Sequence, residues 1–304
     1  MERRASLVAV IVSAACFSTL AILTTFAYRQ GARPLSLLTW RFAIVAVLLT
    51  AYQATRDRSK LLVGLHDMKS YALMSLTGYG ASAICFFVAL QHTSASVVAV
   101  LLYTYPAMVV LLGRILYGES LTRNRMLAIA LTFCGCGLVV GLFSADVSVT
   151  LPGVLLGLGA AMCYALFNVI SQRMVACRSR AVVSAYTFGL SALMLAALSL
   201  ITHDSLSVVS WSPQLWLIMG SIVVVPTIFG VLLYLRGIRS LGPSQAAILS
   251  TTEPLFTIAL AAIFLGERLA PLQCVGAALV VAGVVVAEWR APQGTTRTEA
   301  LAAV

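Results

Sequence analysis

Apolar runs of 17 to 23 residues follow one another along almost the whole chain, with short polar, proline or glycine clusters between them. An apolar helix of about 20 residues crosses the roughly 30 Å hydrocarbon core of a bilayer. The clusters divide the chain into ten candidate spans, at residues 5–27, 35–54, 70–90, 95–117, 124–143, 152–172, 181–201, 214–235, 244–265 and 271–288. The expected fold is therefore an all-α membrane protein with ten transmembrane helices.

Composition argues against a soluble domain, since 61% of the residues are hydrophobic and only 10% are charged. Soluble domains are about half apolar and one quarter charged. The net charge of +10 fits loops that fix the orientation of a membrane protein, so no nucleic-acid partner is expected. The seven cysteines lie mostly inside apolar runs and form no Cys-x-x-Cys pair, which favours small core residues over disulfides or metal ligands. We expect no metal and no other cofactor.

The basic residues predict the orientation. With a cytoplasmic N-terminus, ten spans place sixteen Lys and Arg residues inside and only Arg29, Arg33 and Arg268 outside. Both termini are therefore expected in the cytoplasm, with the protein in a bacterial cytoplasmic (inner) membrane. The first apolar run continues for a full span without a clear cleavage site, which favours a retained helix over a signal peptide. Residues 290–304 are polar enough to predict a disordered cytoplasmic tail.

An internal repeat gives a second view of the organisation. Residues 103–121 align without a gap on residues 251–269, with seven identities in nineteen positions. In the first copy the basic residues follow this helix, whereas in the second copy more of them precede it. The two copies are therefore expected to lie in the membrane with opposite polarity, which is the architecture of many secondary transporters. We predict two inverted five-helix repeats, at residues 1–146 and 147–289.

Four stretches of the sequence resemble EamA domains of the drug/metabolite transporter superfamily. They are ALQHTSASVVAVLLYTYPAMVVLL (89–112), GESLTRNRMLAIALTFCGCGLVV (118–140), GIRSLGPSQAAILSTTEPLFTIAL (237–260) and GERLAPLQCVGAALVVAGVVV (266–286). The resemblance covers both halves of the chain and implies a ten-helix bundle whose central cavity is lined by the first, third, fourth, sixth, eighth and ninth helices. It also implies export of amino acids or other small metabolites. The copies differ where Ala128 and Tyr105 in the first stand for Gly276 and Glu253 in the second.

Glu253 is the candidate residue for substrate binding and for coupling transport to protons. It lies about ten residues, or roughly 15 Å, into the ninth span, which places it near the midplane. A carboxylate at that depth is costly and is expected to face the interior with a partner, a proton or a substrate. The alternative is a protonated acid that only bonds a neighbouring helix. The following Pro254 lacks an amide donor and leaves the Ser250 carbonyl free to face the cavity.

Arg41 is the only basic residue well inside a span, six residues from the outer end of the second. One interpretation is that it snorkels to the surface along its own stem. The alternative is that it pairs with Glu253 or with a substrate carboxylate, and we include it as a candidate coupling residue.

Aromatic and polar residues near the midplane complete the predicted substrate site. They are Tyr79, Tyr103, Tyr105, Tyr164, Asn168, Thr227, Thr251 and Thr252. A pocket with apolar walls and a few polar groups suits a small amphiphilic ligand, although helix packing explains any single one of these residues equally well. Pro106, Pro226 and Pro254 are predicted bend points. Glu119 and Glu267 precede helices and are predicted to be structural.

These features predict a secondary active exporter of small metabolites such as amino acids, working by alternating access with proton coupling. A multidrug efflux carrier is the nearest alternative. An intramembrane enzyme acting on a lipid or small amphiphile is the rival from another class, but no nucleophile and base pair and no His-Glu-x-x-His set is present, so we expect no enzymatic activity. A channel would need polar rings along a pore. The expected partners are a small-molecule substrate, protons and the lipid bilayer; whether the protein is a homodimer stays open.

Overall fold

A computed structural model describes residues 2–89, 92–93, 95–139, 150–202, 206–208, 211–265 and 270–288, and these contain helices but no strand. In chain order the elements are α1 (Glu2–Arg29), α2 (Pro34–Arg56), η1 (Arg58–Leu61), α3 (Leu65–Met74), η2 (Ser75–Ala81), α4 (Ser82–Ala89), α5 (Ala95–Leu102), α6 (Tyr105–Tyr117), α7 (Arg123–Val139), α8 (Leu151–Cys177), α9 (Arg180–Thr202), α10 (Pro213–Ile222), η3 (Val223–Phe229), α11 (Gly230–Leu241), α12 (Pro243–Ser250), α13 (Glu253–Leu265) and α14 (Pro271–Glu288). The predicted tail at 290–304 and Glu267 lie outside the described residues.

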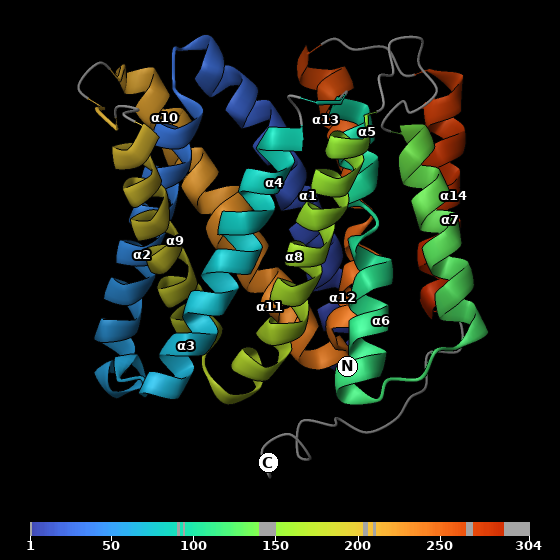
Figure 1. Cartoon of the computed structure of the whole chain (residues 1–304), viewed down its shortest axis with the longest axis horizontal. Helices are drawn as coiled ribbons and strands as arrows, with labels where there is room; N and C mark the ends of the chain where they lie inside the picture. The colour runs from blue at the N-terminus through green and yellow to red at the C-terminus, as the bar shows by residue number, and fades with distance from the viewer. Residues whose placement is uncertain are drawn as a thin grey trace.

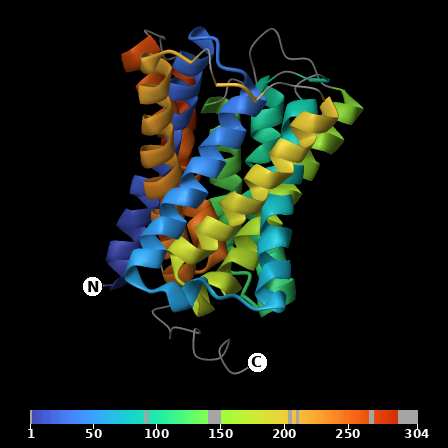
Figure 2. The same cartoon turned by 90° about the vertical axis from the view of Figure 1, so that its left-hand side faces the viewer.

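The helices stand side by side in one bundle (Figures 1 and 2). Helix α1 begins at one end of the bundle, here called the N-terminal end, and α14 ends there as well (Figure 1). The connection from α6 to α7 lies at the N-terminal end, whereas α13 ends and α14 begins at the opposite end (Figure 1). These two helix pairs therefore point in opposite directions.

Seven helical stretches of the described residues are long and apolar enough to cross a membrane. They are Arg3–Arg29, Pro34–Arg56, Val97–Tyr117, Leu151–Cys177, Arg180–Thr202, Pro213–Leu241 and Pro243–Phe264, and Pro271–Ala287 is a shorter apolar helix. The predicted spans at 70–90 and 124–143 fall on α3–η2–α4 and on α7. The all-α membrane class is confirmed, and seven stretches rather than ten meet the length and composition of a crossing.

Two of the long helical stretches are broken near their middle. Tyr103 and Thr104 form a turn between α5 and α6, and Thr251 and Thr252 form one between α12 and α13. In each case a proline follows at the second position of the next helix, where it lacks the N–H that would continue the ladder. Threonine hydroxyls take up carbonyls freed at the breaks, because Thr104 Oγ1 donates to Leu101 O at 2.6 Å and Thr252 Oγ1 donates to Leu249 O at 2.9 Å.

Two further stretches contain a π-helical segment, η2 and η3. Pro226 lies inside η3, which accounts for a local departure from α-helical hydrogen bonding. Gly78 and Gly80 lie inside η2, where neighbouring helices approach closely. A Cβ atom at Gly78 would lie 2.5 Å from Phe167 Cδ2, and one at Gly80 would lie 2.2 Å from Met194 Cε. Such segments occur often at functional sites.

The helix boundaries recur along the chain with a constant spacing of 148 residues. The π-helical segments begin at 75 and 223, the breaks fall at 103–104 and 251–252, and the helices after the breaks span 105–117 and 253–265. Helices α3 and α10 follow the same spacing, as do the starts of α7 and α14.

Helices α7 and α14 pack backbone against backbone through glycines. A Cβ atom at Gly135 would lie 2.7 Å from the carbonyl oxygen of Gly276, and one at Gly283 would lie 3.0 Å from the carbonyl oxygen of Ala128. A shift of 148 residues turns the first contact into the second, so the contact is reciprocal. Ala128, which stands where the second copy has Gly276, thus belongs to this interface.

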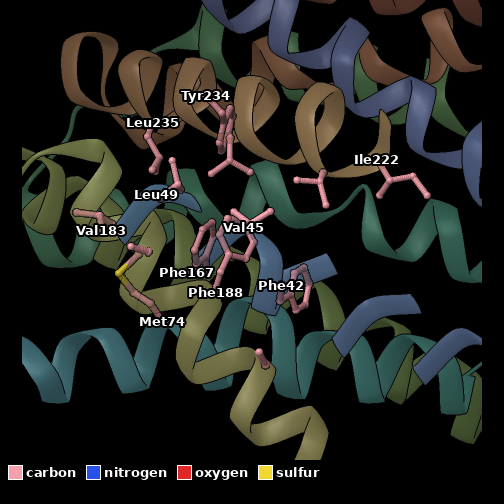
Figure 3. Packing of buried hydrophobic residues seen from close by; sticks show 14 of the residues in the cluster. Phe42, Val45, Leu49, Met74, Phe167, Val183, Phe188, Ile222, Tyr234 and Leu235 are labelled. Carbon is pink, nitrogen blue, oxygen red and sulfur yellow. The ribbon is translucent and has the colours of Figure 1, made fainter. Parts of the chain in front are cut away.

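The largest hydrophobic cluster packs α2, α3, α8, α9 and α11 together. Figure 3 shows Phe167 and Phe188 beside each other, with Val45 and Met74 close by. The ring centroids of Phe42 and Phe188 are 5.2 Å apart. This cluster fixes the helices that carry the residues described next.

Candidate functional site

Glu253 is the first residue of α13 and directly follows the Thr251–Thr252 break. Its side chain is half-buried. Its carboxylate makes no hydrogen bond or ion pair with the described residues, whose ion pairs are Lys60–Asp57, Arg125–Glu119 and Arg178–Asp67. The N-terminus of α13 favours a negative charge at this position. The local fold therefore tolerates the carboxylate without neutralising it.

Four tyrosines gather around Glu253. Its charge acts on the phenols of Tyr103, Tyr105, Tyr164 and Tyr234. The Tyr105 and Tyr164 rings meet edge to face with centroids 4.8 Å apart, and the Tyr105 hydroxyl donates to Ala247 O at 3.3 Å. Helices α6, α8, α11 and α13 thus contribute to one aromatic site with a single acid.

Asn168 ties this tyrosine site to α11. Its Oδ1 accepts a hydrogen bond from the Tyr234 hydroxyl, and its Nδ2 donates to Tyr164 O at 2.8 Å. The side chain is fully buried at 0% exposure. Asn168 therefore fixes two tyrosines of the site.

Tyr79, on η2, joins the tyrosine site to the core around Arg41. Its ring centroid lies 5.1 Å from that of Phe42, 5.4 Å from that of Phe167 and 4.9 Å from that of Phe188. Phe167 in turn stacks on Tyr164 at 5.8 Å. An unbroken row of rings therefore runs from Phe42, beside Arg41, to Tyr164, beside Glu253.

Arg41 is buried and does not snorkel, because only 7% of it is exposed. Its Nε donates to Thr227 Oγ1 at 2.7 Å, and Thr227 Oγ1 donates to Ile222 O at 2.7 Å. The π-helical segment η3 explains this pairing, since an i to i−5 geometry brings the Thr227 hydroxyl to the Ile222 carbonyl. Glu253 does not form an ion pair with Arg41.

The remaining predicted residues lie at the breaks and bends. Thr251 and Thr252 are buried, and their hydroxyls donate to carbonyls one turn back in α12. Pro106 and Pro254 follow the two breaks, and Pro226 lies in η3. Glu253, Tyr103, Tyr105 and Tyr164 are brought together at one break.

Tyr234 was missed by the sequence interpretation. It lies seven residues after Thr227, which places the two on one helix face. That spacing was the available signal, although it does not identify Asn168 as the hydrogen-bond partner.

Among the described residues, no group of three or more His, Cys, Asp and Glu side chains is close enough to hold a metal ion. The charged chemistry near the middle of the bundle is thus that of one carboxylate and one guanidinium, joined by aromatic rings.

Comparison with known proteins places this geometry in a family. The model of the EamA-like transporter family matches residues 4–141 and again residues 151–289. The chain is 26% identical over 272 residues to the uncharacterized transporter YyaM of Bacillus subtilis (strain 168), covering 88% of each chain. It is 28% identical over 284 residues to an uncharacterized transporter of Archaeoglobus fulgidus, covering 93% of this chain and 95% of the relative.

A solved crystal structure superposes with a TM-score of 0.78 at 20% identity, covering 93% of this chain and 96% of the other, and so shares the fold. The family match extends over nearly all of the helical bundle and includes Arg41, the tyrosines and Glu253. The chain belongs to the EamA-like transporter family.

Proposed function

We propose that this membrane transporter is a secondary active exporter of small metabolites such as amino acids, coupled to proton entry. The observation that carries the proposal is Glu253, a carboxylate without a protein partner at the break between α12 and α13, among four tyrosines. A broken helix with a free polar group near the middle of the bundle is typical of transporter substrate sites. Intramembrane acids commonly mark proton and substrate paths.

The mechanism we propose is alternating access by two inverted repeats of five helices, at residues 1–146 and 147–289. The constant spacing of 148 residues between helix boundaries supports the repeat. The reciprocal contact of Gly135 with Gly276 and of Gly283 with Ala128 supports a two-fold relation between α7 and α14, because two-fold related surfaces exchange their contacts. The opposite directions of α6–α7 and α13–α14 support the inversion (Figure 1). Together these observations favour ten crossings.

We place both termini in the cytoplasm of a bacterium, with the protein in the cytoplasmic membrane. The basic residues of the α2–α3, α6–α7 and α8–α9 connections support this orientation, since these connections lie at the N-terminal end (Figure 1). Under this assignment, export moves substrate from the N-terminal end to the opposite end.

In the proposed cycle, the Glu253 carboxyl group takes up a proton from outside and releases it inside, and substrate and proton occupy the site in turn. The tyrosine hydroxyls and the Thr251–Thr252 break surround this group and give it polar neighbours in both protonation states. Pro106, Pro226 and Pro254 lie where the helices depart from α-helical geometry, and we assign the bending of the halves to these points.

The test is counterflow in proteoliposomes with a panel of amino acids, other metabolites and cationic drugs, with and without a proton gradient. We expect saturable counterflow of metabolites and uptake driven by the gradient in inverted vesicles. Glu253→Gln should abolish the gradient-driven uptake, whereas Lys60→Gln, at an exposed loop residue, serves as the matched control. Undiminished gradient-driven uptake by Glu253→Gln would remove the coupling proposal, and a preference for drugs would favour a multidrug carrier.

A further inference from the structure

Arg41 carries a buried positive charge that the protein does not neutralise. Only 7% of the residue is exposed, and no carboxylate of the described residues lies within ion-pair distance. A guanidinium stays protonated at any physiological pH. A buried charge without a counter-ion is unfavourable unless something else pairs with it. The site therefore lacks one negative group.

Most of the hydrogen-bonding capacity of Arg41 is unused. A guanidinium has five N–H donors. Within the part of the chain that the structure describes, Arg41 donates one hydrogen bond, from Nε to Thr227 Oγ1 at 2.7 Å. Its other contact is with an aromatic ring, since Cζ lies 5.3 Å from the ring centroid of Phe42. The two Nη atoms are therefore available to an acceptor.

The surroundings of Arg41 hold the guanidinium in one orientation. Thr227 is fully buried and is itself fixed by its bond to Ile222 O in η3. Phe42 is held between Tyr79 and Phe188, at centroid distances of 5.1 Å and 5.2 Å. A guanidinium fixed at Nε presents Nη donors in a planar fork, and this fork matches the two oxygens of a carboxylate.

Other arginines in the chain show how a structural arginine is satisfied. Arg125 Nη1 pairs with Glu119 Oε2 at 2.9 Å, and Arg178 Nη2 pairs with Asp67 Oδ2 at 2.5 Å. Both are more exposed than Arg41, with side-chain exposures of 24% and 32%. The most buried of the three is thus the one without a carboxylate.

We infer that Arg41 binds the carboxylate of the transported molecule, so that the substrates are small molecules bearing a free carboxylate. This inference rests on the proposed function and names the substrate class for the same cavity. Thr227 is the positioning residue that orients the guanidinium. Neutral derivatives of the same molecules, such as amides, lack the charge and one acceptor oxygen, and Arg41 discriminates against them.

The experiment is counterflow in proteoliposomes with matched pairs of an amino acid and its amide. For the wild-type protein we expect the acid to be preferred by roughly 10- to 100-fold, the range that a charge-assisted hydrogen bond supplies. Arg41→Gln should bring the acid-to-amide ratio close to one, and Arg41→Lys should restore part of it. Thr227→Val keeps the charge but frees the guanidinium, so its ratio should fall between those of wild type and Arg41→Gln. Lys60→Gln is the charge-matched control and should leave the ratio unchanged.

Two outcomes would overturn the inference while leaving the proposed function intact. One is a wild-type protein that transports acid and amide equally well. The other is an Arg41→Gln protein that transports both more slowly at an unchanged ratio, which would indicate a purely structural arginine. If Arg41→Gln is not recovered as folded protein, the ratios for Arg41→Lys and Thr227→Val decide between these readings.

A resident inorganic anion would satisfy the same chemistry, and a second arm of the experiment separates it from a substrate carboxylate. If the acid preference vanishes in Arg41→Gln whether or not chloride is present, the substrate supplies the anion. If every substrate, acid or amide, instead depends on chloride through Arg41, the carboxylate assignment is wrong. Absence of saturable counterflow for every compound would contradict the proposed function, and the inference with it.

Discussion

Glu119 and Glu253 are two carboxylates at helix boundaries that the same fold treats in opposite ways. Glu119 lies in the turn between α6 and α7, and its Oε2 accepts from Ser244 Oγ at 2.7 Å and pairs with Arg125 Nη1 at 2.9 Å. A Cβ atom at Gly113 would lie 3.1 Å from Glu119 Cδ, so the carboxylate fits closely against α6. Glu253, at the start of α13, has tyrosines around it but no bonded partner among the described residues.

The difference indicates what each carboxylate does. Glu119 joins the first half of the chain to α12 and is only 15% exposed, which suits a permanent structural link at the N-terminal end. Fully bonded carboxylates stabilise a fold, while an unbonded one in the middle of a membrane bundle is kept at a cost. A protein that can build the site of Glu119 has the means to neutralise Glu253, and its failure to do so favours a role in transport.

The largest expected effect separates the two acids by activity. Glu253→Gln should reduce gradient-driven uptake by at least about 100-fold, while its thermal stability in detergent stays the same or rises, because an unpaired charge at a functional site is removed. Uptake assays and thermal unfolding on the same preparation measure both quantities. A Glu253→Gln protein that loses stability and activity together would make Glu253 structural, like Glu119.

The second effect separates them by stability. Glu119→Ala should lower the free energy of unfolding by about 1–3 kcal/mol, because the Ser244 hydroxyl and the Arg125 guanidinium both lose their acceptor. The fraction of folded protein after heating in detergent gives the measurement. Glu119→Gln keeps the shape and one acceptor oxygen, and it should cost less. Unchanged stability in both variants would remove the proposed link.

A smaller effect isolates the contact between the halves. Ser244→Ala removes the hydroxyl that reaches Glu119 but leaves the Arg125 pair in place, so about 0.5–1.5 kcal/mol is expected. The double variant with Glu119→Ala should be less destabilised than the sum of the two single variants, because they share one bond. Additive effects in this thermal double-mutant cycle would contradict a direct interaction.

The smallest effect concerns Asp57, an acid in the loop after α2. Hydrogen bonds from Ser59 and Lys60 lower the pKa of Asp57. A lowered pKa in the folded state contributes stability above the unfolded value of about 3.9, and that contribution is lost as the pH falls through the folded value. The pair is exposed, so Asp57→Asn should change thermal stability only slightly at pH 7. A large loss at pH 7 would show that this loop matters more than its exposure indicates.

Much of the bundle follows from patterns that are local in sequence. Apolar runs and their separators predicted helices at every position where the described chain has a long one, and prolines 106 and 254 marked both breaks to within three residues. The family could be identified from the stretches around Gly118 and Gly266, because those motifs are contiguous. The all-α membrane class and the family were thus within reach of the sequence.

The pairings within the site were not predictable in the same way. Arg41 and Thr227 are 186 residues apart, and Tyr234 and Asn168 are 66 apart, so only the packing of the helices brings them together. The π-helical segments also escape a pattern analysis, since one shifted hydrogen bond does not alter the apolar character of the segment. The burial of Arg41 depends on η3, which explains why snorkelling looked equally reasonable from the sequence.

The glycine contact between α7 and α14 has an evolutionary consequence. Two copies of one short polypeptide, inserted into a bilayer in opposite orientations, would meet through the same surface on each, and every useful substitution would improve both sides at once. Joining the two genes end to end would preserve that surface inside a single molecule. The crossed pairing of Gly135 and Gly283 with residues 148 positions away from each other's partners is the trace such an event would leave.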